Sequence, residues 1–265
     1  MPSCTFGKQF FFMETLFNLS GKVALITGAS KGIGESTAYL LGKAGAKIVI
    51  SSRKQDELDA LAARFTAEGM DVLPIACNVG KPEDLQNLVS KTIEHYGTID
   101  ILINNAATNP TFGPLEMTDA AAFDKIMNVN VKAPFELAKL VLPYFKSQNH
   151  GSIVNISSIG GLSPEQYLGI YSVSKAALVS MTKSMAKEWG QYNVKSNVVC
   201  PGLIKTKFSE ALWTDEKMLK HFLRQVPNGR MGSTEEIAAI ILFLSSDAAG
   251  YCNGSVFTAD GGYTA

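Results

Sequence analysis

The sequence predicts an α/β protein with a single domain, a doubly wound sheet of about seven parallel strands with helices on both faces. Seven short and nearly continuous apolar runs indicate the strands, at residues 23–27, 47–51, 71–77, 100–104, 152–157, 194–199 and 255–259. They do not alternate between apolar and polar residues, as a strand with one solvent-exposed face does. This lack of alternation is typical of strands buried on both faces. Stretches of helical length separate them, and this alternation implies right-handed βαβ units.

The helical stretches carry their own start and stop signals. Residues 55–69 place apolar side chains at helical spacing and end at Gly69, and residues 81–97 have Pro82 near the start and Gly97 at the end. Residues 203–232 do not fit the alternation and are expected to form an insertion over the sheet. No linker, repeat or low-complexity tract divides the chain, so we predict an N-terminal extension at residues 1–18 and one domain at residues 19–265.

Composition narrows the class of function. The 265 residues carry 24 Lys plus Arg and 24 Asp plus Glu, so no basic excess indicates a nucleic-acid or membrane partner. The four cysteines form no CxxC pair and the three histidines show no ligand spacing, so no metal site is expected. The longest apolar run, residues 237–244, is too short to span a bilayer. A cytoplasmic location is the simplest expectation.

A glycine-rich turn follows the first predicted strand. The segment "TGASKGIG" puts glycines at positions 28, 32 and 34, directly before a helical pattern. Glycine lets the backbone turn tightly and approach a pyrophosphate, and the helix that follows offers free N–H groups to this anion. The turn therefore predicts a Rossmann-like dinucleotide site, with these members expected at the coenzyme: Gly28, Ser30, Lys31, Gly32, Ile33 and Gly34.

The end of the second predicted strand indicates which dinucleotide binds. An NAD site usually carries Asp or Glu there, whereas this chain has Ser52, followed by Arg53 and Lys54. Lys31 lies in the glycine-rich turn itself. Because a 2′-phosphate needs positive charge and arginine can bind it with two hydrogen bonds, the pattern favours NADP(H).

Further motifs carry a family resemblance. "TGASKGIG", "NNAA" (104–107), "NVN" (128–130), "SS" (157–158), "YSVSK" (171–175) and "PG" (201–202) follow one another in the order and spacing of the short-chain dehydrogenase/reductase family, which the chain resembles over residues 20–265. Local stretches such as "NNAATNPTFGP" and "PGLIKTKFSEALW" are most similar to its dehydrogenase/reductase member 4 group of NADPH-dependent carbonyl and retinal reductases. "NNAA" departs mildly from the usual "NNAG", and Asn78 stands where an aspartate is common.

The resemblance implies four catalytic residues, Asn130, Ser158, Tyr171 and Lys175. A carbonyl that accepts a hydride needs a proton, and a tyrosine hydroxyl with an ordinary pKa of about 10 donates it more readily beside a cation. Lys175, one helical turn from Tyr171, can supply this charge. By resemblance, Ser158 holds the substrate carbonyl and Asn130 holds a water of the proton relay. Ser157 is the competitor to Ser158, and we expect it to point away.

The resemblance also implies the other coenzyme contacts. Tyr171 and Lys175 would hold the nicotinamide ribose, and the segments that follow the third, fourth and sixth strands would line the rest. These further positions are Asn78, Val79, Asn105, Ala106, Ala107, Pro201, Gly202, Ile204 and Thr206.

The predicted substrate wall is apolar. In the family, the segment after residue 203 is a flap over the substrate, and this chain fills it with large apolar side chains. Together with Ser158 we expect Phe112, Leu162, Tyr167, Phe208, Leu212 and Trp213 to contact a bulky apolar or aromatic carbonyl compound. The family also implies a homotetramer or homodimer.

Other interpretations stay open. A 3-oxoacyl-[acyl-carrier-protein] reductase shares the fold and the catalytic residues, but would need a basic docking face. A non-catalytic dinucleotide-binding scaffold typically loses the tyrosine or the lysine, and here both are present. An epimerase of the extended family usually has a longer chain.

Overall fold

The computed structural model describes residues 16–265, without the side chains of Ala211, Leu212 and Met218. Residues 1–15, most of the predicted extension, lie outside the described residues. Leu19 is already part of the core, because its side chain is buried and its backbone N–H bonds the Ala44 carbonyl at 2.8 Å. The boundary at residue 19 stays a prediction.

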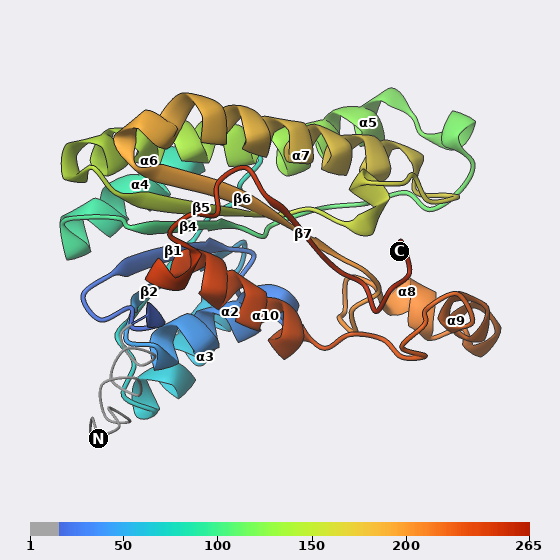
Figure 1. The fold of residues 1–265 in the computed structure, drawn as a ribbon, viewed down its shortest axis with the longest axis horizontal. Helices are drawn as coiled ribbons and strands as arrows, with labels where there is room; N and C mark the ends of the chain where they lie inside the picture. Colours follow the sequence, from blue (N-terminus) through green and yellow to red (C-terminus); the bar gives the residue numbers. More distant parts are fainter. Residues whose placement is uncertain (1–15) are drawn as a thin grey trace, which may run out of the picture.

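A single sheet of seven parallel strands forms the centre of the molecule (Figure 1). Its order, β3-β2-β1-β4-β5-β6-β7, is that of a doubly wound fold and confirms the predicted fold class. Each predicted strand is present, with β6 two residues longer than expected. The strands are β1 (Val23–Thr27), β2 (Lys47–Ser52), β3 (Val72–Ala76), β4 (Ile101–Asn104), β5 (Gly151–Ile156), β6 (Val194–Pro201) and β7 (Val256–Ala259).

Helices cover both faces of the sheet, as predicted (Figure 1). One face packs against α2 (Gly32–Lys43), α3 (Gln55–Ala67) and α10 (Thr234–Ser245). The other packs against α4 (Pro82–Tyr96), α6 (Ala133–Gln148) and α7 (Gly169–Trp189). The central strands β1, β4 and β5 are buried on both faces, which explains their continuous apolar sequence.

Local sequence sets where these helices begin and end. Pro82 opens α4, and Gly97 ends it in the left-handed conformation at φ 78°. A capping box of Ser233 and Glu236 opens α10, with each side chain bonded to the other residue's backbone N–H.

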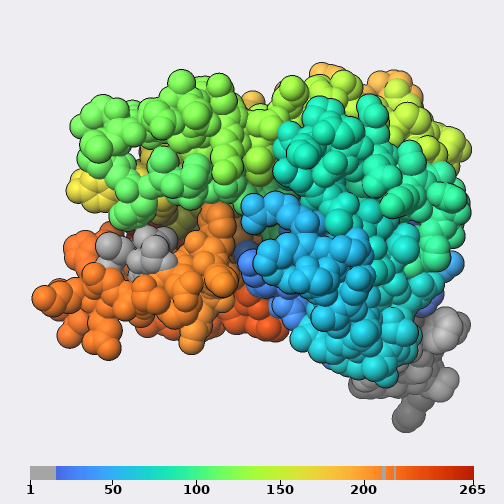
Figure 2. Space-filling model, turned by 180° about the vertical axis from the view of Figure 1, so that it is seen from behind, coloured from blue at the N-terminus to red at the C-terminus, as the bar shows by residue number. Residues whose placement is uncertain are grey.

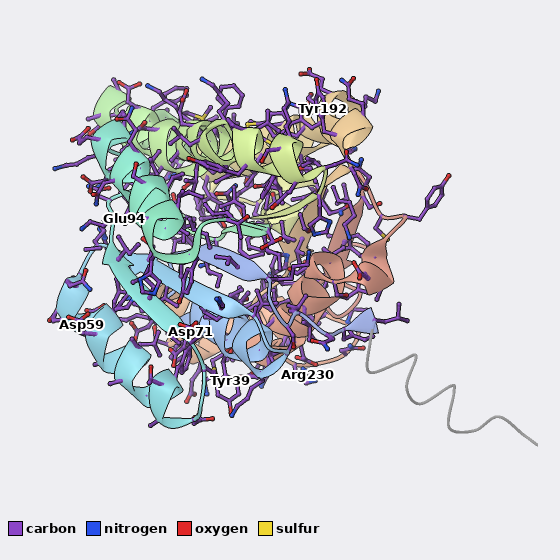
Figure 3. All side chains as sticks on the ribbon, turned by 90° about the vertical axis from the view of Figure 1, so that its left-hand side faces the viewer. Tyr39, Asp59, Asp71, Glu94, Tyr192 and Arg230 are labelled. Atoms are coloured by element: carbon purple, nitrogen blue, oxygen red, sulfur yellow. The ribbon has the colours of Figure 1, made fainter. Side chains whose placement is uncertain are left out.

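Polar side chains line the outer surface of the helical layers. Figure 3 shows Asp59 on α3 and Glu94 on α4 at this outer surface. Tyr39 donates a hydrogen bond to Glu68 at 3.0 Å. Within residues 16–265, no helix is long and apolar enough to cross a bilayer.

The segment at residues 203–232 is not an irregular loop. It contains α8 (Glu210–Trp213) and α9 (Glu216–Leu223), and a single bridge between Ile204 and Gly232 joins its two ends. Figure 1 shows α8 and α9 side by side at one end of the sheet.

The remaining short elements connect the main ones. Near the site lie η1 (Leu115–Met117), α5 (Ala120–Met127), the π-helical turn η2 (Asn128–Lys132) and η3 (Ile159–Gly161). Two further 3₁₀ turns, η4 (Gly190–Tyr192) and η5 (Asp247–Ala249), lie near β6 and α10.

Candidate active site

The glycine-rich turn connects β1 to α2 and has no room for a side chain at its glycines. Gly28 has φ +65°, and a Cβ there would lie 2.9 Å from the Ala106 Cα. A Cβ on Gly34 would overlap the Gly28 carbonyl oxygen, and Gly32 starts α2 at φ +62°. Only glycine satisfies these positions, and the turn forms a cradle of backbone at a helix N-terminus.

Thr27 and Asn105 hold this cradle in place. The Asn105 amide donates to the carbonyls of Thr27 at 3.0 Å and Gly28 at 2.9 Å. The Thr27 hydroxyl accepts the backbone N–H groups of Asn105 and Ala106, both at 3.1 Å. The side chain of Asn105, expected at the coenzyme, therefore fixes the turn. Sequence reasoning did not single out Thr27, although it ends the first strand directly before the glycines.

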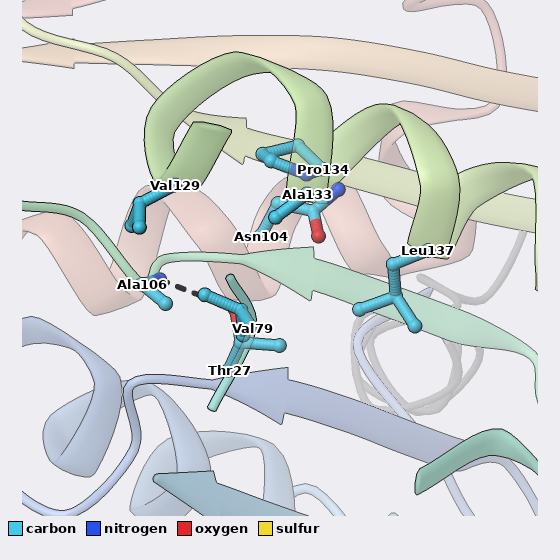
Figure 4. A pocket seen from close by; sticks show the side chains of 8 residues that line it. All are labelled: Thr27, Val79, Asn104, Ala106, Val129, Ala133, Pro134 and Leu137. Carbon is cyan, nitrogen blue, oxygen red and sulfur yellow. Dashed lines mark hydrogen bonds between the residues drawn. The ribbon is translucent and has the colours of Figure 1, made fainter. Parts of the chain in front are cut away.

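A small cavity lies beside the cradle, between the ends of β1 and β4 and the start of α6 (Figure 4). Val79, a predicted coenzyme residue, lies in its wall, as does Ala106. The full lining is Thr27, Val79, Asn104, Ala106, Val129, Ala133, Pro134 and Leu137.

Of the basic residues expected at a 2′-phosphate, one is already paired with an acidic side chain. Lys54 forms an ion pair with Glu57 at 2.8 Å. Hydrogen bonding from Lys54 lowers the pKa of Glu57, and the charge of Lys31 acts in the same direction. Arg53 is exposed and has no hydrogen bond or ion pair among the described residues. Sequence reasoning missed Glu57, which lies one helical turn beyond Lys54.

Ser52 and Asn78 lie at the ends of neighbouring strands. The Ser52 hydroxyl is buried and has no hydrogen-bond partner among the described residues. The backbone N–H of Asn78 donates to Asp84 at 2.8 Å, and its side-chain oxygen accepts the Gly80 N–H at 3.1 Å. That oxygen has one lone pair left for a contact with the coenzyme, where Asn78 is predicted to lie.

These features fit a dinucleotide. The cradle has no space for a Cβ at Gly28 or Gly34, the helix N-terminus faces it, and the orphaned Ser52 hydroxyl lies at the strand end where such sites bind a ribose. When bound, a nicotinamide dinucleotide supplies or accepts a hydride.

Tyr171 and Lys175 lie on the first turns of α7 and are both buried. The Lys175 ammonium donates to the Ile156 carbonyl at 2.7 Å and lies 5.6 Å from the centroid of the Tyr171 ring. The end of β5 therefore fixes the lysine against the tyrosine, as the "YSVSK" spacing predicts.

Burial dominates the protonation of this pair. It lowers the pKa of Lys175 to about 8. It raises the pKa of Tyr171 above its usual value; a hydrogen bond from Ser158 opposes that rise, and the charge of Glu165 adds to it. The pKa of Tyr171 is thus shifted upward, whereas the positive charge of Lys175 was expected to lower it. A Tyr171 pKa lowered toward neutral pH therefore remains a prediction.

The two serines after β5 have separate roles. The Ser157 hydroxyl is buried and donates to the Lys175 backbone carbonyl at 2.8 Å, away from the tyrosine. The Ser158 hydroxyl accepts the Gly160 N–H at 3.1 Å and bonds Tyr171. The structure thus brings Ser158, Tyr171 and Lys175 together.

Asn130 lies in the π-helical turn η2, a rare geometry that often marks functional sites. Its side chain accepts the Thr108 N–H at 2.8 Å and donates to the Thr108 carbonyl and the Ser174 hydroxyl, both at 3.0 Å. Asn130 therefore links the segment after β4 to α7, next to Lys175. A role in holding a water stays a prediction.

A chain of buried amides supports the catalytic helix, and sequence reasoning missed it. Asn104 donates to Asn155 at 2.8 Å, and Asn155 donates to Thr182 on α7 at 2.9 Å. Every amide and hydroxyl in it has a partner, so it fixes α7 against β4 and β5 without the cost of an unpaired polar group.

The segment after β6 lies across the cradle. A Cβ on Gly32 would contact the Thr206 methyl group at 3.3 Å, and Gly202 packs closely on Asp260. The Ile204 and Thr206 carbonyls, which we expected near the coenzyme, accept from Ser209 at 2.6 Å and from Trp213 at 3.0 Å. Pro201 ends β6 and is buried, and Ala107 lies half-buried after Ala106.

The predicted substrate wall consists of exposed aromatic and aliphatic side chains. Phe112 and Tyr167 contact each other at a centroid distance of 5.7 Å, and Phe208 lies 6.1 Å from Tyr171. Leu162 is also exposed, Trp213 is half-buried, and the Leu212 side chain lies outside the described residues. Figure 2 shows the segment after β4, in green, opposite the segment after β6, in orange.

Comparison with known proteins identifies the family. A family model described as enoyl-(acyl carrier protein) reductase matches residues 28–264. Dehydrogenase/reductase SDR family member 4 of Oryctolagus cuniculus is 42% identical over 92% of this chain and 94% of its own length. The chain belongs to the short-chain dehydrogenase/reductase family. Membership confirms the family resemblance that the motifs predicted and makes the chain an oxidoreductase of CH–OH and carbonyl groups.

Solved structures agree with this family assignment. A gluconate 5-dehydrogenase from Burkholderia cenocepacia J2315, in complex with NADP and tartrate, superposes with a TM-score of 0.91 at 31% identity, over 95% of this chain and 98% of the other. A 7α-hydroxysteroid dehydrogenase complexed with NADH and 7-oxo glycochenodeoxycholic acid has a TM-score of 0.90 at 30% identity, covering 94% and 96%. Members with this fold therefore include complexes with either dinucleotide.

Proposed function

We propose that this protein is an NADP(H)-dependent reductase of ketones and aldehydes, with Tyr171 as the proton donor. One observation carries the proposal: Ser158 and the Lys175 ammonium both lie close to Tyr171, and the exposed Phe208 ring lies beside that tyrosine. The 42% identity with a dehydrogenase/reductase SDR family member 4 over nearly the full chain supports the carbonyl-reductase interpretation.

The residues divide the chemistry between them. Ser158 orients the carbonyl oxygen and donates a hydrogen bond as negative charge develops on it. Tyr171 transfers its hydroxyl proton to that oxygen, and the Lys175 ammonium stabilises the phenolate that remains. Asn130 positions α7 through Ser174. The reduced nicotinamide supplies the hydride when it is bound.

NADP(H) is the proposed coenzyme because positive charge surrounds the predicted 2′-phosphate position. Lys31 and Arg53 are available there, whereas Lys54 first has to leave Glu57 or share it. The bound NADP in the Burkholderia cenocepacia structure supports this choice, and the NADH in the 7α-hydroxysteroid dehydrogenase shows that the fold alone does not determine it.

The proposed substrate is a bulky apolar or aromatic carbonyl compound, because the wall around Tyr171 presents Phe112, Tyr167 and Phe208. A homotetramer and a cytoplasmic location remain part of the proposal. One relative, the human dehydrogenase/reductase SDR family member 2, is named mitochondrial, so fractionation of cells is needed for the second point.

The test is NADPH oxidation with a panel of carbonyl compounds, run in parallel with NADH. The panel contains aromatic ketones, α-diketones, retinal and an acetoacetyl thioester. Turnover of the apolar ketones with NADPH is expected. A clear preference for the thioester would favour the 3-oxoacyl-[acyl-carrier-protein] reductase interpretation. No turnover of any compound, with NADPH still bound, would contradict the proposed carbonyl reduction.

A further inference from the structure

The flap at residues 203–232 has two halves, and the half that contains α8 is held by its own chain. The Ser209 hydroxyl donates to the Ile204 carbonyl at 2.6 Å, and the Trp213 indole donates to the Thr206 carbonyl at 3.0 Å. Both acceptors lie in the stretch that leaves β6. The first half of the flap is therefore fixed as soon as β6 is in place.

The half that contains α9 meets a segment from the other end of the sequence. Residues 260–265, which follow β7, lie against it at the end of the sheet where α8 and α9 are found (Figure 1). The Asn228 N–H donates to the Gly261 carbonyl at 3.1 Å. A Cβ on Gly261, which has φ +67°, would lie 2.8 Å from the Val226 Cγ1, so the two backbones approach as closely as a glycine allows.

An aromatic stack completes this contact. The ring of Tyr263 lies on the ring of Phe222 in α9, with a centroid distance of 4.8 Å and an interplanar angle of 10°. Both side chains are half-buried. Because a stacked pair is stabilised beyond the area that it buries and has a preferred geometry, it fixes both the position and the orientation of α9 against residues 260–265.

The segment that carries the tyrosine is itself well anchored. The Asp260 carboxylate accepts the N–H groups of Gly262 and Thr264, both at 2.9 Å, and the Thr264 hydroxyl at 2.7 Å. Directly before this turn, the Ala259 carbonyl accepts the Gly202 N–H at 3.0 Å. The segment therefore extends from the end of β6, where the coenzyme is predicted, to the second half of the flap.

We propose that Tyr263 is a positioning residue for the substrate side of the site. Its stack on Phe222 holds the α9 half of the flap in place, and the flap opens where this stack separates. The inference rests on the proposed function, in which the flap forms part of the substrate wall through Phe208, 6.1 Å from the ring of Tyr171. It adds the contact that keeps this part of the wall in place.

Limited digestion with trypsin tests the stack without a substrate. α9 and the residue after it carry three exposed cleavage sites, Lys217, Lys220 and Arg224, and a helical segment is cut in its locally opened state. Tyr263→Ala should raise the cleavage rate at these sites by about fivefold, as expected for the loss of a stacked aromatic pair. Tyr263→Phe keeps the ring and should be cut at the wild-type rate. Mass spectrometry of the fragments identifies the bonds that are cut.

Further variants locate the effect. Tyr251→Ala, which removes a fully exposed tyrosine before β7, should leave the cleavage rate unchanged. Phe222→Ala separates the stack from the flap side, and it decides the question if Tyr263→Ala is cut throughout the chain. The double variant should be cut no faster than either single variant. Wild-type cleavage in both single variants, or additive effects in the double variant, would overturn the inference.

Steady-state kinetics relate the stack to the reaction. Tyr263→Ala should raise KM for bulky aromatic ketones several-fold, because the substrate then binds to a flap that is less often closed. The turnover number and the dissociation constant of NADPH should stay unchanged. A lower turnover number with an unchanged KM would contradict the positioning role. Faster cleavage of α9 in Tyr263→Ala, together with a wild type that reduces no carbonyl compound, would support the stack and contradict the proposed function alone.

Discussion

The two sides of the site are built in different ways. On the coenzyme side, Gly28, Gly34 and Asn105 leave no space for one additional methyl group. On the substrate side, the large side chains of the wall have exposures between 42% and 56%; they are Leu162, Tyr167, Phe112 and Phe208. The first surface is specified by the backbone and the second by side chains.

The contrast between these surfaces indicates where the protein can change. A substitution in the cradle has to displace the backbone, and it therefore affects folding and coenzyme binding together. A substitution in the wall removes little buried area, so it can alter which substrate binds while the fold stays the same. A family with one coenzyme chemistry and many substrates is expected to have this division.

The largest effect is expected where the two sides meet. Tyr171→Phe removes the proposed proton donor and keeps the ring that packs near Phe208. We expect turnover to fall by about a thousandfold with NADPH affinity unchanged. Single-turnover kinetics and coenzyme titration measure the two quantities, with Tyr144→Phe on α6 as the control. Retained turnover would remove Tyr171 from the mechanism.

The second prediction concerns the buried charge of Lys175, which lies where the coenzyme and substrate sides meet. Its pKa is lowered to about 8 in the folded protein, so the unfolded state binds more protons between that pH and the ordinary value of 10.5. The contribution of Lys175 to wild-type stability should therefore rise as the pH increases through this window, by at most about 3 kcal/mol. Lys175→Met should lack the rise and lose turnover. The free energy of unfolding of both proteins is measured by chemical denaturation from pH 7.5 to about 10.5. If it changes with pH in the same way in the wild type and in Lys175→Met, the assigned pKa is wrong.

A pair of glycines compares the two sides directly. Gly34→Ala puts a methyl group against the Gly28 carbonyl, whereas a methyl group on Gly113, next to Phe112, would meet no atom within 4 Å and no positive φ. We expect a loss of about 2–3 kcal/mol for Gly34→Ala and less than about 0.5 kcal/mol for Gly113→Ala. Urea denaturation measures both, and similar losses would show that the two surfaces are equally constrained.

On the coenzyme side, the charge of one residue, rather than its shape, should determine the preference for NADPH over NADH. Arg53→Asp replaces an exposed cation at the predicted 2′-phosphate with an anion. The ratio of kcat/KM for NADPH to that for NADH should fall by about tenfold or more. Lys91→Asp, exposed on α4, is the matched charge change elsewhere and should leave the ratio alone. If Arg53→Asp leaves the NADPH to NADH ratio of kcat/KM unchanged, the assignment of NADP(H) is wrong.

The smallest effect on stability is expected in the wall. Phe208 is 56% exposed, so Phe208→Ala should change the free energy of unfolding by no more than about 0.5 kcal/mol. It should nevertheless raise KM for aromatic ketones several-fold, while the NADPH affinity stays the same. A large drop in stability with unchanged KM would show that Phe208 belongs to the core.

The sequence predicted the elements whose signal is local. All seven strands, the helix limits at Pro82 and Gly97, and the glycine-rich turn follow from patterns within a few residues. The contacts that it missed join distant segments. Thr27 meets Asn105, and Asn155 connects Asn104 to Thr182, and nothing in the neighbourhood of any of these residues indicates its partner.

The flap and the site charges show a second limit. Residues 203–232 contain two short helices that the sheet–helix alternation could not predict. The sequence did not single out Glu57 or Glu165, because burial and the charge of neighbours arise only in the folded chain. The pKa of Tyr171 likewise depends on burial, which spacing alone does not reveal.

The strand order has a consequence for how the chain folds. β1 lies inside the sheet, and the hydrogen bond from Asn105 to Thr27 joins residues 78 positions apart. The first strand emerges early during synthesis but has both neighbours only after β4 has left the ribosome. Until then one edge of β1 stays open, and such an edge can pair with another chain. We therefore expect slow folding and a need for chaperones at high expression, with the glycine-rich turn ordering late although it is encoded first.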